Sequence, residues 1–269
     1  MTTLHVLGGI DLRDVYGHPI ELKARKSRQL LAYLAVPSGQ IRSREQLASL
    51  LWNDRQDEQA RGSLRTALSG IRRAIGDDAL IVEHDTVRLR DGCLITDYDQ
   101  LKNLPDNNGN VSSLEDFYSG EFLTGFEHDS ELFTEWLRDI RNECVNFAIS
   151  VLQKNADRFT KEGDNSSAIE LLRDSLSLEP LKEQTHRMIM RLHAANGERA
   201  MAMAQFRTCK DVLIHELDTV PDPETQALAD SIALRDTSVS DDLRRPAAPV
   251  SESSSSNQQY RLFFKNQIH

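Results

Sequence analysis

The sequence has no hydrophobic run of the roughly 18 residues that cross a membrane, and its first residues lack the apolar core of a signal peptide. Cysteine is scarce: Cys93, Cys144 and Cys209 are far apart and form no CxxC pair. Such spacing argues against a disulfide framework and predicts buried thiols in a reducing compartment. The sequence therefore favours a cytoplasmic protein over a membrane-spanning or secreted one.

Catalytic motifs are also missing. The sequence contains no GxxxxGK[ST], GxSxG, HExxH or GxGxxG pattern. His186 and His193 lie seven residues apart, but no cysteine or carboxylate completes a metal-binding set around them. We therefore expect no enzyme activity, no cofactor and no metal site.

The net charge of −10 is distributed unevenly along the chain. Residues 1–95 hold 14 Lys and Arg and 12 Asp and Glu, a net charge of +2. Residues 96–269 hold the other 18 Lys and Arg and 30 Asp and Glu, a net charge of −12. A nearly neutral segment with a local basic face is compatible with nucleic-acid binding. The acidic remainder is expected to lie away from the phosphates.

The segment DEQARGSLRTALSGIRRAIG, which starts at Asp57, separates into two faces on a helix of about 100° per residue. Its apolar residues fall in one arc about 120° wide, as in a helix that packs on a core. Arg61, Arg65 and Arg72 lie within about 40° of one another on the adjacent face. Asp57 is expected to be the N-cap and Gly76 the stop. We interpret this helix as a DNA recognition helix.

An ordinary solvated surface helix is the alternative, because such helices also carry several arginines. The mixture of opposite charges that is typical of a surface helix is missing here, which favours a binding face. The helix is also the third in a predicted order of small sheet, three helices and hairpin. That order predicts an α+β winged helix-turn-helix domain over residues 1–95. Its predicted elements are strands at 4–7, 10–13 and 20–22, helices at 27–36, 43–52 and 57–75, and a hairpin of 80–83 with 86–90.

Helix-turn-helix geometry assigns the third helix to the major groove, where a guanidinium fork suits guanine and hydroxyls suit bases or phosphates. Basic residues near helix starts commonly meet phosphate, and a basic residue on the hairpin can make a wing contact. For each basic residue near a helix start or on the hairpin, the alternative is an ordinary solvated charge that makes no DNA contact. The candidate DNA-binding residues are Arg61, Arg65, Thr66, Ser69, Arg72 and Arg73 on the third helix, Lys26, Arg42 and Arg44 near helix starts, and Arg88 on the hairpin.

The second part of the chain is predicted to be an all-α, TPR-like repeat domain over residues 96–235. The segment AIELL at 168–172 matches AMAQF at 202–206, 34 residues later, which is the period of tetratricopeptide helix pairs. The Ser- and Pro-rich residues 236–269 are too polar to fold and are expected to be disordered. The other expected helices are 97–104, 112–118, 130–159 and 222–234, with a polar loop at 105–110.

The run IRSREQLASLLWNDRQDEQARGSLRTALSGIRRAIGDDALIV resembles the OmpR-like winged helix of SARP-type bacterial transcriptional activators. In the wing this chain has TVRL at 86–89, where the family usually has a Gly-Tyr-x-Leu sequence. The segment YSGEFLTGF, Trp136 with Arg141, and the later VPDPETQAL resemble the bacterial transcriptional activation domain that follows the winged helix in that family.

The resemblance implies a sequence-specific, DNA-binding activator. Family members suggest side-by-side protomers on direct-repeat operators and a contact with RNA polymerase through the loop at residues 53–56. The competing class is a protein–protein adaptor, in which the helical repeats carry the function and the winged helix is a contact module.

Overall fold

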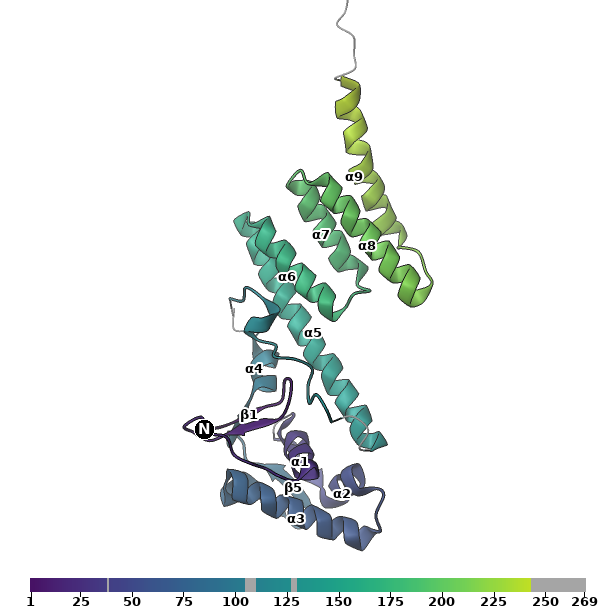
Figure 1. Cartoon of the computed structure of the whole chain (residues 1–269). Coiled ribbons are helices and arrows are strands. Elements are labelled where there is room, and N and C mark those ends of the chain that lie inside the picture. Colours follow the sequence, from purple (N-terminus) through teal and green to yellow (C-terminus); the bar gives the residue numbers. More distant parts are fainter. Residues whose placement is uncertain (38, 105–109, 127–129, 243–269) are drawn as a thin grey trace, which may run out of the picture.

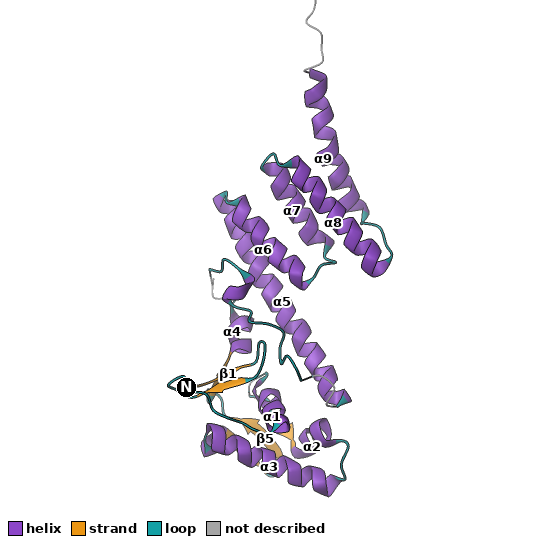
Figure 2. Ribbon diagram, viewed as in Figure 1, coloured by secondary structure: helices purple, strands orange, loops and turns teal. Residues whose placement is uncertain are grey.

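The computed structural model describes residues 1–37, 39–104, 110–126 and 130–242, with side chains described as far as residue 234. The molecule is elongated, with a small α+β part at one end and a stack of helices that leads away from it (Figures 1 and 2). The N-terminal part contains β1 (Thr2–His5), β2 (Asp11–Arg13), α1 (Arg25–Ala35), β3 (Arg42–Ser43), α2 (Arg44–Trp52), α3 (Asp57–Ile75), η1 (Asp77–Ala79), β4 (Leu80–Glu83), β5 (Thr86–Leu89) and β6 (Leu94–Thr96).

These strands form two three-stranded sheets. The first has the order β2-β1-β6, with β1 antiparallel to β2 and parallel to β6. The second has the order β3-β5-β4 and contains the predicted hairpin, which turns at His84. The strand predicted at 20–22 is wrong: the chain there makes one bridge, from Pro19 to Arg13, before it leaves toward α1.

The three helices follow the predicted order. Ser43 and Gln46 form the expected capping box at the start of α2, which satisfies backbone N–H groups that have no partner within the helix. Asp57 is the first residue of α3 and not its N-cap; Gln56 holds that position without a side-chain cap. Gly76 ends α3 with φ 102°, a backbone conformation that glycine adopts without strain.

The second part is helical throughout the elements that the structure describes. The predicted helix at 112–118 is wrong, since one 3₁₀ turn stands there. Helix α5 begins, as expected, at Ser130, whose side chain caps it, and ends at Glu162 before Gly163. The repeat is confirmed by Ala168 and Ala202, both fully buried on the two matching helices. The elements are α4 (Asp97–Asn103), η2 (Leu114–Asp116), α5 (Glu131–Glu162), α6 (Asn165–Leu178), α7 (Glu183–Ala195), α8 (Arg199–Leu217) and α9 (Pro223–Asp242).

Helix α9 is longer than the sequence pattern predicts. It starts at Pro223 as expected but continues past Leu234 to Asp242, into the segment expected to be disordered. The next proline is Pro246, so no residue before it forces the helix to stop. The rest of that segment, 243–269, and most of the predicted polar loop, 105–109, lie outside the described residues.

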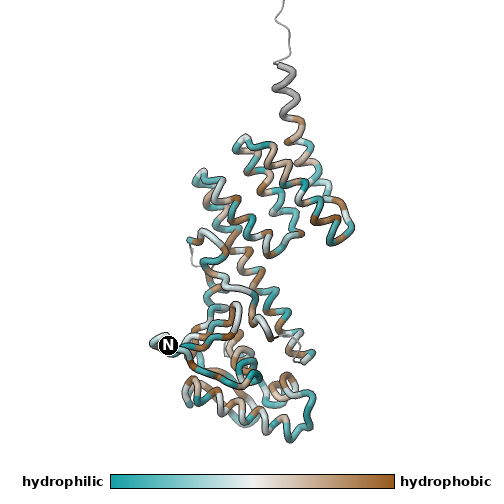
Figure 3. The backbone as a smooth tube through the Cα atoms, in the orientation of Figure 1, coloured by the Kyte–Doolittle hydropathy of each residue, from teal (hydrophilic) through white to brown (hydrophobic). Residues whose placement is uncertain are grey.

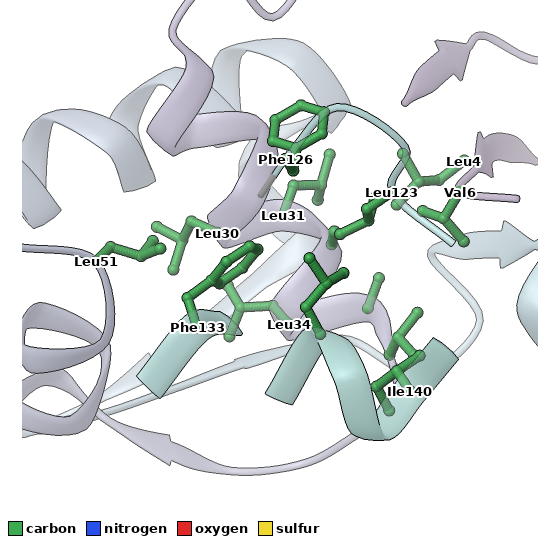
Figure 4. Packing of buried hydrophobic residues seen from close by; sticks show 14 of the residues in the cluster. Leu4, Val6, Leu30, Leu31, Leu34, Leu51, Leu123, Phe126, Phe133 and Ile140 are labelled. Atoms are coloured by element: carbon green, nitrogen blue, oxygen red, sulfur yellow. The ribbon is translucent and has the colours of Figure 1, made fainter. Parts of the chain in front are cut away.

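One hydrophobic core joins the winged helix to the beginning of the helical stack. Leu30, Leu31 and Leu34 of α1 pack with Phe133 and Ile140 of α5, as Figure 4 shows. The segment before α5 closes this core with the buried side chains of Phe122, Leu123 and Phe126.

Aromatic contacts and one half-buried arginine hold this junction. The Trp136 ring lies 4.9 Å from Tyr33 and 5.7 Å from Phe122, measured between centroids. Arg141 donates from Nε to the Phe122 carbonyl at 2.9 Å and from Nη2 to the Leu123 carbonyl at 3.2 Å. The 122–123 backbone is thereby fixed to α5.

Helix α5 connects two cores without a break. Ala148 belongs to the core shared with the winged helix, and Leu152, one turn later, belongs to the core shared with α6 and α7. A third cluster joins α7, α8 and α9. Hydrophilic and hydrophobic residues alternate along these helices, as Figure 3 shows, so each helix presents one side to its neighbours. Within the described residues, no helix is long and apolar enough to cross a membrane.

The Arg141→Ala substitution is expected to lower the free energy of unfolding by about 2–3 kcal/mol, because the Phe122 carbonyl loses a charged donor. Urea denaturation measures this change. Arg138, one turn away and 68% exposed, provides the matched control, for which we expect a change of less than about 0.5 kcal/mol. Equal effects for the two variants would contradict the assigned role of Arg141.

The thiols are expected to differ in reactivity. Burial raises the pKa of Cys144 to about 12 and that of Cys209 to about 11, and both side chains are almost fully enclosed. Cys93 is half-buried, and burial raises its pKa as well. Because the thiolate is the reactive form, a thiol reagent at pH 8 should modify only Cys93 in the native protein and all three cysteines after denaturation. Rapid modification of Cys144 in the native protein would disprove this expectation.

Candidate nucleic-acid interface

Helix α3 presents its arginines to solvent. Its apolar side is buried through residues such as Leu64 and Ile71. Arg61 and Arg65 are exposed on the adjacent side, and Arg72 is half-buried on the same face. At 1.5 Å per residue, the three guanidinium groups are distributed over roughly 16 Å of the helix, enough for several phosphates.

The described helices of the acidic half, α4 to α9, do not cover this face. Helix α3 lies at the end of the molecule that is farthest from α6–α9 (Figure 1). Helix α5 approaches the winged helix from the side of α1, where the shared core lies. The arginine face is therefore open to a large ligand.

On one flank of α3, the start of α2 and the tip of the hairpin complete a basic hollow of about 310 Å³. Arg44 joins Arg61 and Arg65 there, facing His84 and Asp85, so three guanidinium groups stand against the carboxylates of Glu45 and Asp85. The Arg44 backbone N–H donates to the Asp85 carbonyl at 2.7 Å, which ties the helix start to the hairpin tip. The Arg44 Nε is buried without a partner in the described part of the chain. The structure thus brings three of the predicted residues together.

The remaining α3 candidates point elsewhere. Ser69 is exposed between the two flanks. Thr66 and Arg73 line a separate hollow on the opposite flank, beside the start of α1. Arg61 and Arg65 therefore lie on one flank of the helix and Thr66 and Arg73 on the other.

Lys26 has a structural contact instead of the exposed position that the sequence suggested. Its Nζ donates to the Leu51 carbonyl at 2.5 Å and lies 5.7 Å from the centre of the Trp52 ring. It also lies 3.8 Å from Asp54. The ammonium thus stabilises the carbonyl end of α2 and ties α1 to α2.

Arg42 and Arg88 belong to the second sheet and are both half-buried. The Arg42 guanidinium lies 4.7 Å from the centre of the Tyr33 ring, on the side of the sheet that faces α1. The Arg88 Nη1 is 3.9 Å from an Asp91 carboxylate oxygen. Neither residue lines the hollow that contains Arg61.

Three polar residues that the sequence reasoning passed over lie at this surface. His84 has φ 48° at the hairpin tip and borders the basic hollow. Arg55 donates to the Ser63 hydroxyl at 2.8 Å, so it lies against the start of α3. Lys23 lines the hollow of Arg73. The predicted hairpin of 80–83 with 86–90 puts His84 in its turn, but only the folded chain places the other two beside α3.

Comparison with known proteins assigns both parts of the chain. Residues 17–88 match the family "Transcriptional regulatory protein, C terminal", and residues 112–233 match the "Bacterial transcriptional activator domain". These two domain families, in this order, fit a SARP-type transcriptional regulator. Both matching families are regulatory and not enzymatic, and the adaptor class is not favoured.

Two known proteins are similar to this chain over most of its length. Regulatory protein AfsR from Streptomyces griseus is 22% identical over 229 residues, which cover 82% of this chain but only 23% of AfsR. The solved structure of Mycobacterium tuberculosis EmbR, in complex with a low-affinity phosphopeptide, superposes with a TM-score of 0.68 at 18% identity. That match covers 87% of this chain and 65% of the EmbR chain, and it confirms the fold of a winged helix followed by a helical domain.

The Lys26→Ala substitution is expected to lower the free energy of unfolding by about 1–2 kcal/mol, because it removes a charged donor from the Leu51 carbonyl. Lys23→Ala, three residues earlier and 84% exposed, is the control and should change stability by less than about 0.5 kcal/mol. Both are measured by urea denaturation. If Lys26→Ala leaves stability unchanged, the assigned contact is not made in solution.

Proposed function

We propose that this protein is a sequence-specific activator of transcription that binds double-stranded DNA through α3. The observation that supports this best is the open arginine face of α3, bordered by the start of α2 and by the hairpin tip. A winged helix places its third helix in the major groove and its hairpin against the neighbouring backbone. The SARP-type family assignment is consistent with that placement.

The arginines have different proposed roles. Arg61, Arg65 and Arg72 enter the groove, where a guanidinium reads guanine or holds phosphate, and Ser69 contacts a base or a phosphate between them. Arg44 and the hairpin hold the backbone on one flank, and Thr66 and Arg73 lie on the other. Arg42 and Arg88 are peripheral candidates, and Lys26 acts indirectly by supporting α2.

Residues 1–95 are the proposed DNA-binding part, residues 96–235 the activation part and residues 236–269 a tail. RNA polymerase is the proposed partner of the loop at 53–56, all four residues of which are exposed. Side-by-side protomers on direct repeats are the proposed assembly, in the bacterial cytoplasm. These partners are suggested by the family resemblance.

Selection of bound duplexes from a random DNA pool tests the proposal as a whole. The expected result is an enriched motif that occurs as two direct repeats. Binding to the selected duplex should weaken with salt at a slope of log K against log salt of about −4 to −5, as four to six phosphate contacts require. Failure to enrich any motif, with only salt-insensitive binding, would favour the adaptor class.

Arg65→Ala and Arg72→Ala are each expected to cost about 1–3 kcal/mol in binding to the selected duplex while the fold stays intact. Fluorescence anisotropy measures the affinity, and circular dichroism checks the fold. Arg138→Ala, an exposed arginine on α5, is the control and should bind DNA as the unmodified chain does. Unchanged affinity in both α3 variants would remove the case for this face.

A further inference from the structure

A second hollow, of about 430 Å³, lies on the flank of α3 opposite Arg61 and Arg65. It runs between α3 and the first turn of α1. Thr66 follows Arg65 directly, so its side chain is rotated by about 100° around α3 and faces this other flank. The hollow is lined by Ile20, Glu21, Leu22, Lys23, Ala24, Ser27, Thr66, Gly70, Arg73 and Ala74.

The start of α1 gives this hollow a positive potential. Ala24 is the N-cap and makes no side-chain cap hydrogen bond, and the first turn contains no acidic residue. The partial positive charge at a helix start is normally compensated by such groups. An anion in the hollow would supply the missing compensation.

A buried hydroxyl also points to a ligand. Ser27 is 5% exposed, and its hydroxyl has no hydrogen-bond partner among the described residues, although it lines the hollow. The oxygen itself is not fully enclosed, so the hydroxyl is accessible from the hollow and can donate to an anion there. Across from it is Gly70, where a Cβ atom would lie 3.9 Å from the Ser27 Oγ. The glycine keeps the floor of the hollow open beside this hydroxyl.

Two cations lie at the same hollow. The Lys23 side chain is 84% exposed, and its Nζ lies 3.9 Å from Glu21, whose carboxylate also lines the hollow and is 77% exposed. Arg73 reaches the Ser69 carbonyl only through Nε, at 3.5 Å. Thr66 Oγ1 already donates to the Gly62 carbonyl, so this side chain lines the hollow but offers no hydrogen bond to a ligand. The positive charge of two cations and of the helix start, with one hydroxyl donor, thus exceeds the negative charge of the single Glu21 carboxylate.

We propose that this hollow binds a phosphate group of the DNA backbone, held by Lys23, Ser27, Arg73 and the start of α1. The inference rests on the proposed function, in which α3 lies in the major groove. That groove is about 12 Å wide and a helix is about 10–12 Å across, so both flanks of α3 face a phosphate strand. The hollow of Arg44 holds one strand, and the hollow of Ser27 holds the other.

Lys23→Gln and Gly70→Ala test the contact in the full chain. Lys23→Gln is expected to weaken binding to the selected duplex about 3- to 10-fold and to reduce the salt slope by about 0.9, the value for one phosphate. Gly70→Ala places a methyl group on the floor of the hollow, so DNA affinity should fall. This loss is expected even though alanine favours the helical conformation more than glycine does. Lys102→Gln, an exposed lysine on α4, is the control and should change neither quantity.

Methylphosphonate scanning locates the contact. A neutral methylphosphonate is placed at each position of the duplex, and Lys23→Gln is compared with the unmodified chain. At one position the difference in affinity between the two proteins should disappear, because the phosphate charge that Lys23 contacts is already absent from that duplex. If no position has this effect, or if Lys23→Gln keeps the full salt slope, the proposal is overturned.

Inorganic phosphate distinguishes the two sources of the group. Binding of inorganic phosphate is followed by the Ser27 amide signal in NMR. If Lys23→Gln and Gly70→Ala weaken this binding but leave DNA affinity unchanged, the hollow binds a free phosphate and the contact with the DNA backbone is disproved. A chain that binds no duplex at all would contradict the proposed function instead.

Discussion

Helix α5 packs against α1 of the winged helix, and the position of everything beyond depends on this contact. Phe133 and Ile140 are buried in the same core as Leu30 and Leu34. Arg141 binds the carbonyls of the segment that closes the core. The burial of these side chains and the hydrogen bonds of one charged group act together, so the winged helix and the first half of α5 form one unit.

This arrangement explains how an acidic protein can expose a basic face. The shared core lies on the α1 side of the winged helix, and α3 faces the other way (Figure 1). The acidic helices are therefore attached at a distance from the arginines and do not pair with them. Long-range repulsion from the acidic half is screened within about 8–10 Å at physiological salt.

Much of the fold could be predicted from local sequence signals. The capping box of Ser43 and Gln46, the cap at Ser130 and the stop at Gly163 each act within a few residues, so the ends of these helices were predictable. The buried stripe of α3 was predictable for the same reason. Beyond Leu234 such signals are weak, and the predicted end of α9 was too early.

Features that depend on distant partners were not predictable in this way. β3 and β6 contain two and three residues, too few to show an alternating pattern, and each exists because a longer strand pairs with it. Lys26 looked like a surface charge until the folded chain placed the Leu51 carbonyl beside it. The split of the α3 candidates into two flanks depends on what lies next to each, which helical spacing alone does not specify.

The unbroken course of α5 has a geometrical consequence. Its 32 residues form a rod of roughly 48 Å, anchored at one end in the winged helix and at the other in the α6–α7 core. Each residue of a helix turns its far end by about 100°, so inserting or deleting a single residue between the two anchors would rotate the outer helices by about that angle relative to the winged helix. The length of α5 thus sets the direction in which the outer repeats point relative to α3, and so relative to the DNA in the proposed complex.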